Sequence, residues 1–167
     1  MFRPRKDRRR QMRWARLESL EPRALLTTFT VTSLADTVAD DGEMTLREAI
    51  DAASADDTAF HHDIVFADGL NGTITLQLGE FDLDRYEMPS LTIVGNGQNN
   101  TIIDAQHNSD IFSTPYSYSS FSLRSLTLSN SAGNGVENTA AYNWLSLRDT
   151  VITVSYTHLT LPTICSV

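Results

Sequence analysis

Oxygen-rich side chains cluster in a turn near the start of the acidic part of the chain. Four acids occur close together there: Asp36, Asp40, Asp41 and Glu43. Carboxylate oxygens are the ligands that calcium prefers, so this turn is a candidate calcium site. The spacing does not follow the EF-hand loop, because Val38 stands where that loop needs a ligand. The alternative is an ordinary solvated loop.

The run His61-His62-Asp63 is a second group of possible metal ligands. Adjacent residues of an extended segment point to opposite faces, so two neighbouring histidines rarely bind one ion. We therefore expect loop residues here rather than a metal centre.

Paired carboxylates could carry out the acid–base chemistry of a glycoside hydrolase. The candidates are Asp82, Asp84, Asp104 and Asp110. That chemistry depends on a separation between the carboxylates that sequence alone does not fix. Any Asp-rich chain offers such pairs, so no catalytic residue is assigned.

Two arginines, Arg124 and Arg148, occupy matching positions of a repeated segment. Stacked on neighbouring strands, they would form a basic ladder for an acidic polysaccharide. Tyr116 and Tyr118 alternate nearby, and aromatic rings on an exposed face can stack on sugars. A uronate lyase uses a base and a calcium ion beside such a substrate. The alternatives are a pair of solvated arginines and an aromatic loop packed against the body.

A short helix is predicted over residues 45–54. Thr45 and Glu48 have the spacing of a capping box, in which each side chain bonds the other residue's backbone N–H. An apolar stripe at helical spacing follows the cap, formed by Leu46, Ala49, Ile50 and Ala53. A helix this short must dock on other elements to be stable.

Strand-like segments make up the rest of the body. Residues 28–33 alternate threonine with other residues, and from Ile64 onward short apolar runs are separated by Asn-Gly and Asp-Gly turns. Such turns also favour hairpins, so a β-sandwich is an alternative. However, SLRSLTLS (122–129) matches SLRDTVIT (146–153) at an offset of 24 residues. A repeat of this length is typical of solenoids. The sequence therefore predicts an all-β fold, a right-handed parallel β-helix whose open first coil is capped by the helix.

Charge divides the 167-residue chain into two parts. Nine of the 13 Lys and Arg residues lie at or before Arg23 with three acids, which gives +6, whereas the remainder carries four arginines and 18 acids, which gives −14. A body this acidic would repel the phosphates of nucleic acid. No apolar run reaches the length of a membrane span. With one cysteine, Cys165, disulfides do not build the fold.

The last residues, 154–167, differ in character from the rest. VSYTHLTLPT, from Val154 to Thr163, resembles the in-frame translation of a transposon-end sequencing adapter. We therefore expect the chain to be a truncated reading frame whose authentic sequence ends near Thr153, and we leave this tail out of the fold prediction.

Two resemblances indicate where the protein works. LESLEPRALL resembles the LEPR-XLL motif of large secreted or surface proteins of planctomycete-type bacteria; the matching residues are Leu17, Glu18, Leu20, Glu21, Pro22, Arg23, Leu25 and Leu26. The region around TLREAI (45–50) is similar to the CSLREA-type N-terminal region of bacterial surface proteins, which continue into parallel β-helices akin to polymorphic outer-membrane proteins. The cysteine usual in that motif is Met44 here. The resemblances imply a secreted or cell-surface protein and no defined reaction.

These observations predict four parts. Residues 1–26 would form a disordered basic head with an export motif, 27–62 a cap, 63–153 the first β-helix coils, and 154–167 an artefact. The predicted function is a non-catalytic, adhesin-like scaffold that contacts polysaccharide or cell-envelope components and is recognised by export machinery. No cofactor is expected. A polysaccharide lyase or glycosidase whose active site lies in missing coils, and a calcium-dependent structural module, are the alternatives.

Overall fold

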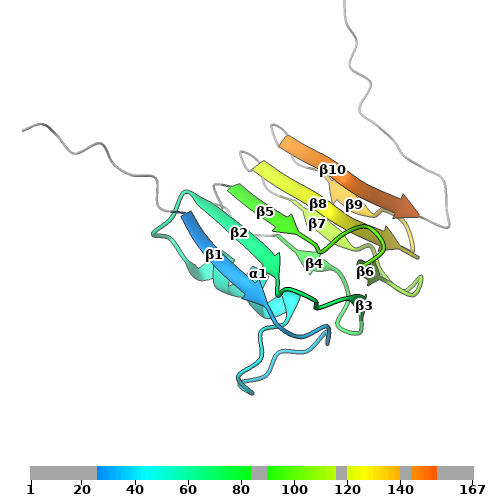
Figure 1. The fold of residues 1–167 in the computed structure, drawn as a ribbon. Coiled ribbons are helices and arrows are strands. Elements are labelled where there is room, and N and C mark those ends of the chain that lie inside the picture. Colours follow the sequence, from blue (N-terminus) through cyan, green and yellow to red (C-terminus); the bar gives the residue numbers. More distant parts are fainter. Residues whose placement is uncertain (1–25, 84–89, 116–119, 140–143, 154–167) are drawn as a thin grey trace, which may run out of the picture.

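The fold is described by a computed structural model, which covers residues 26–83, 90–115, 120–139 and 144–153. Its strands are short and belong to two sheets, with one helix on the N-terminal side (Figure 1). All strand pairs among these residues are parallel. The hairpins of a sandwich are therefore not formed at the Asn-Gly turns.

The large sheet has seven strands in the order β1-β2-β5-β8-β6-β3, with β10 also paired to β8. The bounds are β1 Leu26–Val31, β2 His61–Phe66, β3 Gly72–Thr75, β5 Ser90–Val94, β6 Thr101–Asp104, β8 Ser120–Ser129 and β10 Trp144–Thr153. The small sheet consists of β4 Phe81–Asp82, β7 Phe112–Thr114 and β9 Val136–Asn138.

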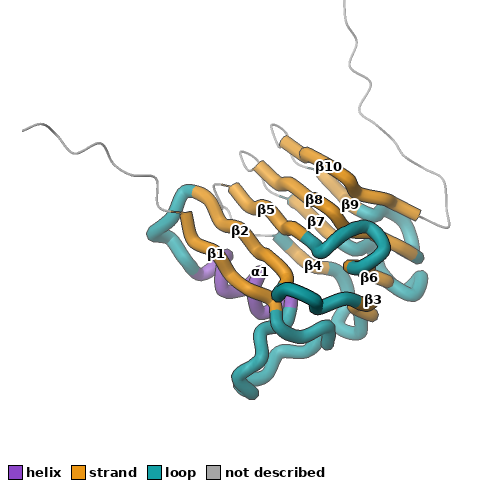
Figure 2. Tube along the Cα trace, viewed as in Figure 1, coloured by secondary structure: helices purple, strands orange, loops and turns teal. Residues whose placement is uncertain are grey.

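The large sheet curls because its longest strands bend in the middle (Figure 2). Ser125 has a φ of 53° and Asp149 a φ of 46°, both in the left-handed region. Before this bend β8 pairs with β5, and beyond it β8 pairs with β6. Gly95 lies against the bend, where an added Cβ would stand 2.5 Å from the Ser125 carbonyl oxygen, so only glycine fits.

The predicted right-handed β-helix is wrong. The matched segments do pair in the predicted register, Leu123 with Leu147 and Leu128 with Ile152. The offset of 24 residues does not extend along the chain, however: Leu26 pairs with His61, 35 residues later, and Leu91 with Phe121, 30 residues later. Coils of such unequal length do not build a regular solenoid. The chain forms instead one curled parallel sheet, which a short second sheet and a helix cover.

The predicted helix is present as α1, Leu46–Ala55. The Thr45 hydroxyl accepts from the Glu48 N–H at 3.2 Å, and the Glu48 carboxylate accepts from the Thr45 N–H at 2.9 Å. The capping box is therefore confirmed. The apolar stripe is buried as expected, and α1 packs on β1 and β2.

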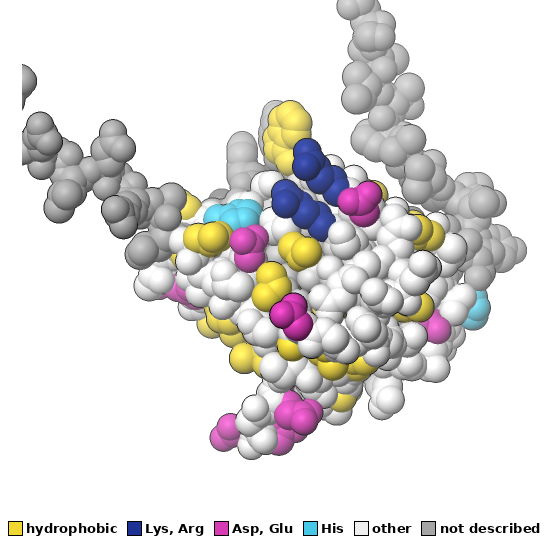
Figure 3. Space-filling model, viewed as in Figure 1, with side chains coloured by type: hydrophobic (Ala, Val, Ile, Leu, Met, Phe, Trp, Pro, Cys, Tyr) yellow, Lys and Arg dark blue, Asp and Glu magenta, His cyan; other side chains and the backbone are white. Residues whose placement is uncertain are grey.

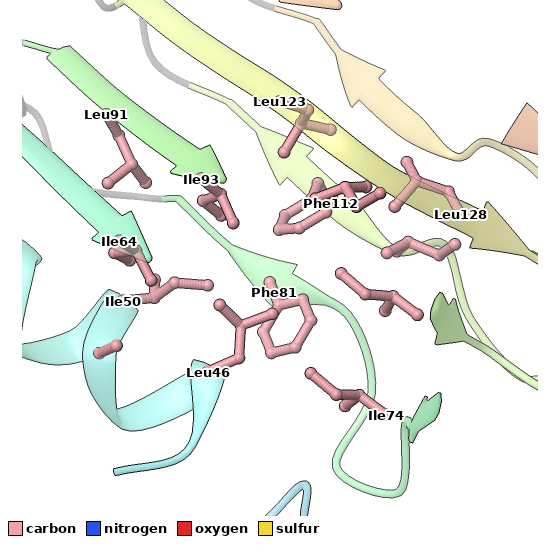
Figure 4. Packing of buried hydrophobic residues seen from close by; sticks show 14 of the residues in the cluster. Leu46, Ile50, Ile64, Ile74, Phe81, Leu91, Ile93, Phe112, Leu123 and Leu128 are labelled. Carbon is pink, nitrogen blue, oxygen red and sulfur yellow. The ribbon is translucent and has the colours of Figure 1, made fainter. Parts of the chain in front are cut away.

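One hydrophobic core joins both sheets and the helix (Figure 4). Phe112 of the small sheet lies 5.2 Å, between ring centroids, from both Phe81 and Phe121. Leu46 and Ile50 of α1 enter the same cluster beside Ile64. Because this core occupies only one face of the large sheet, the opposite face of β1, β2, β5, β8 and β10 remains free to carry polar side chains.

Candidate functional site

The outer face of the large sheet gathers the polar residues that could carry a function (Figure 3). Side chains alternate across a strand, and parallel register aligns them in rows across neighbouring strands. Three rows result from the pairing. They are Leu26, His61, Ser90, Ser120 and Trp144; then Thr28, Asp63, Thr92, Ser122 and Ser146; then Thr30, Val65, Val94, Arg124 and Arg148.

His61 stands at the centre of a hydrogen-bonded group on this face. Its Nδ1 lies 2.7 Å from the Ser90 Oγ, and its Nε2 lies 2.9 Å from an Asp63 carboxylate oxygen. The Thr92 hydroxyl lies 3.3 Å from the same Nε2. The side chains of His61 and Asp63 remain 37% and 28% exposed, so a ligand can reach them.

Arg124 and Arg148 are brought side by side, as predicted, because β8 and β10 pair at these residues. Both are exposed. Neither guanidinium forms a hydrogen bond or an ion pair with the described residues. Figure 3 shows Lys and Arg side chains gathered at this end of the face. Neighbouring strands stand about 4.8 Å apart, so the two cations lie close together on an acidic protein.

Trp144 lies on the same face of β10 as Arg148, four residues before it, and is 79% exposed. Strand geometry places their Cα atoms about 13 Å apart. An aromatic ring at one end of the strand and a pair of guanidinium groups at the other are thus aligned along one surface. The sequence predicts an aromatic contact with sugar at Tyr116 and Tyr118, and both residues lie outside the described residues.

Asp36 has a structural role that the sequence prediction missed. Its side chain is fully buried and accepts from Arg47 Nε at 2.7 Å and from the Gln77 and Leu78 N–H groups. Burial alone would raise the pKa of Asp36, but the hydrogen bond from Arg47 and those from Leu78 and Gln77 outweigh it and lower that pKa.

The acidic turn does not converge on a metal position within the described residues. Asp41 accepts from the Glu43 N–H at 2.9 Å, whereas Asp36 points inward. No group of three or more candidate ligands that could hold an ion occurs in the described part of the chain. Calcium binding by this turn, an alternative to a solvated loop, therefore stays a prediction.

The carboxylates considered for a hydrolase make hydrogen bonds with different partners and do not form one described group. Asp104 accepts from the Gln106 N–H and the Asn130 amide, while Asp110 accepts from Asn134 at 2.8 Å. Asp82 belongs to β4, and Asp84 lies outside the described residues. A fifth acid, Glu80, has its pKa raised by burial and then by the charges of Asp110, Glu137 and Asp82.

The histidine pair lies in strand β2, not in a loop as predicted. His61 faces outward, while His62 is buried, with its ring centroid 6.1 Å from that of Phe29. The two histidines project from opposite faces of the strand, as the sequence predicts, so they cannot bind one ion together. The link from His61 to Asp63 could have been found from their spacing of two residues in a strand. Ser90 could not, because its place depends on strand register.

Comparison with known proteins assigns no family: no family model matches the chain, and neither does a curated protein or a solved structure. Among the described residues, no helix is long and apolar enough to cross a membrane. The predicted targeting motif, Leu17 to Leu26, lies outside the described residues except for Leu26, which begins β1.

Proposed function

We propose that this protein is a binding scaffold that contacts acidic polysaccharide through the outer face of its large sheet. The observation that carries the proposal is the pair Arg124 and Arg148, aligned by parallel register and free of any acidic partner among the described residues. In a body with a net charge of −14, two adjacent cations that lack an acidic partner among the described residues favour an anion from outside the chain as their partner.

The chemistry of the pair favours carboxylates. A guanidinium group presents a planar fork of donors that meets a carboxylate through two parallel hydrogen bonds. Two forks about 4.8 Å apart suit a ligand with repeated carboxylates, such as a uronate chain. Ser120 and Ser146, which are exposed on the same face, add hydroxyl groups that can bond the sugar hydroxyls.

Trp144 supports a carbohydrate over another polyanion. Its exposed indole offers an apolar face on which a sugar ring can stack, while Arg148 lies further along the same strand. A short acidic oligosaccharide laid along β10 would contact both residues at once. A binding face of this kind fits a protein that works outside the cell, secreted or at the surface, where such polymers occur.

Calorimetry with oligogalacturonate tests the proposal directly. We expect binding by the full chain, a loss of at least about tenfold in affinity for each of Arg124→Gln and Arg148→Gln, and a further loss for Trp144→Ala. Higher salt should weaken the interaction, because exposed charges are screened.

The control separates charge from geometry. The variants Arg124→Lys and Arg148→Lys keep the charge and lose the planar fork, so their affinity should lie between those of the wild type and the glutamine variants. Wild-type affinity in the glutamine variants, with unchanged circular dichroism, would overturn the proposal.

A further inference from the structure

We infer that Ser90 is the nucleophile of an esterase site, with His61 as its base and Asp63 as the residue that orients the base. This reaction goes beyond the binding proposed above, and only the choice of substrate rests on it. The inference begins with two contacts: the Ser90 Oγ lies 2.7 Å from His61 Nδ1, and an Asp63 carboxylate oxygen lies 2.9 Å from His61 Nε2.

A serine hydroxyl reacts as a nucleophile when an adjacent base takes its proton and a third group orients that base. Here the carboxylate accepts a hydrogen bond from Nε2–H, which fixes the tautomer in which Nδ1 is free to accept from the serine. The two ring nitrogens have exchanged the roles that they take in serine proteases. The requirement is unchanged, since one nitrogen must donate while the other accepts.

Strand pairing sets this geometry. His61 and Asp63 are two residues apart in β2 and therefore project from the same face, and β5 pairs with β2 so that Ser90 lies beside His61. The same row continues across the next strands: Ser90 pairs with Ser120, and Ser120 pairs with Trp144. Across the face the row therefore holds the base His61, the nucleophile Ser90, a hydroxyl donor at Ser120 and an aromatic ring at Trp144.

The reaction assigned to this row is the hydrolysis of a carboxylic ester. The Ser90 Oγ forms a bond to the acyl carbon while its proton moves to His61 Nδ1, and the Ser120 hydroxyl can donate to the developing oxyanion. The ester C–O bond then breaks, and the alcohol leaves with the proton from His61. Water attacks the acyl-serine by the same route in reverse, which releases the carboxylic acid and restores Ser90.

The substrate class follows from the openness of the site. The row lies on the outer sheet face, and one row separates it from the row of Arg124 and Arg148, so a polymer that runs along the strands can cross both. We assign short O-acyl groups, such as acetyl esters, on the hydroxyls of the bound acidic polysaccharide. A single hydroxyl donor gives less oxyanion stabilisation than the two donors of an oxyanion hole, so turnover should be slow and the covalent adduct should be the clearer signal.

A fluorophosphonate probe tests the nucleophile without any glycan. On the full chain, we expect a covalent adduct on the peptide that contains Ser90, identified by mass spectrometry, and a slow release of 4-nitrophenol from 4-nitrophenyl acetate. Ser90→Ala and His61→Gln should abolish both signals. Ser54→Ala is the matched control and should leave both unchanged, because Ser54 belongs to α1, which packs on the core side of the sheet.

Asp63 is a positioning residue and needs a separate readout. Asp63→Asn should lower the kcat of ester hydrolysis at least about tenfold with little change in KM, because the orienting carboxylate is lost and the substrate contacts remain. Absence of an adduct on Ser90 in protein with native circular dichroism, or full turnover by Ser90→Ala, would overturn the inference. Oligogalacturonate binding by Ser90→Ala reports independently on the binding proposal.

Discussion

Arg47 connects three segments through a single side chain. Its guanidinium bonds Asp36 at 2.7 Å and the carbonyl oxygens of Gly79 and Glu80 at 2.7 and 3.1 Å, and it stands 4.6 Å above the ring of Phe81. The helix, the acidic turn and the start of the small sheet are thereby joined. Each of its three nitrogens donates at least one hydrogen bond, so the cost of burying its charge is offset.

Replacing Arg47 should lower the stability of the fold, because it leaves the Asp36 carboxylate buried without a cation. In Arg47→Ala, Asp36 remains fully buried without its cation, so we expect the free energy of unfolding in urea to fall by about 3–5 kcal/mol. Arg124→Ala, which removes an exposed arginine, should change it by no more than about 0.5 kcal/mol. Equal effects of the two substitutions would contradict this role.

The same pair also sets the response of stability to acid. The folded-state pKa of Asp36 lies below its ordinary value, so its contribution is complete above that ordinary value and is lost as the pH falls through the folded pKa. Without Arg47 that pKa rises, and acid unfolding of Arg47→Ala should begin at higher pH than in the wild type.

At the scale of the element, α1 is held by its first turn. The Thr45 hydroxyl accepts from the Glu48 N–H and donates to the Thr37 carbonyl oxygen at 2.9 Å, so it fastens the helix to the turn before it. Glu48 also accepts from the Ala39 N–H, and the bonds from the Thr45 and Ala39 backbones lower the pKa of Glu48.

Thr45→Ala should destabilise the protein by about 1–2 kcal/mol in urea unfolding, because the helix loses its cap and the Thr37 carbonyl loses its donor. Thr45→Ser keeps the hydroxyl and should stay within about 0.5 kcal/mol of the wild type. If the serine variant were as unstable as the alanine variant, the loss would come from packing of the methyl group and not from the cap.

Local patterns allowed the helix, its cap and the register of β8 with β10 to be predicted, because each depends on residues close in sequence or on a nearly identical repeat. The pairing of the other strands depends on connections whose lengths differ, and these made the solenoid prediction wrong. The group around His61 was not found for the same reason: Ser90 comes 29 residues later, and only strand pairing brings it to the ring.

At the scale of the whole molecule, one hydrophobic core stabilises the fold, and the core-facing side chains of β10 are less buried than those of β8. Leu123 and Leu147 pair in adjacent strands and face the same side, but Leu123 is fully buried whereas Leu147 is 43% exposed. Identical side chains in identical register thus differ only in what covers them.

The pair provides a matched measure of that cover. Leu123→Ala should lower the free energy of unfolding by about 2–5 kcal/mol, since it leaves a cavity between the sheets. Leu147→Ala should cost less than about 1.5 kcal/mol, because much of its surface already meets solvent. Urea unfolding of both variants measures the difference, and similar losses would show that β10 is covered as well as β8.

The unequal offsets between paired strands have an evolutionary consequence. Strand pairing sets the register, so the connections can lengthen or shorten without displacing the residues of the outer face. The connection between β1 and β2, for example, is long enough to contain the helix. Insertions and deletions would be accepted in the connections, while single substitutions on the face would change what it binds. Such a protein can acquire new ligands without altering the scaffold that presents them.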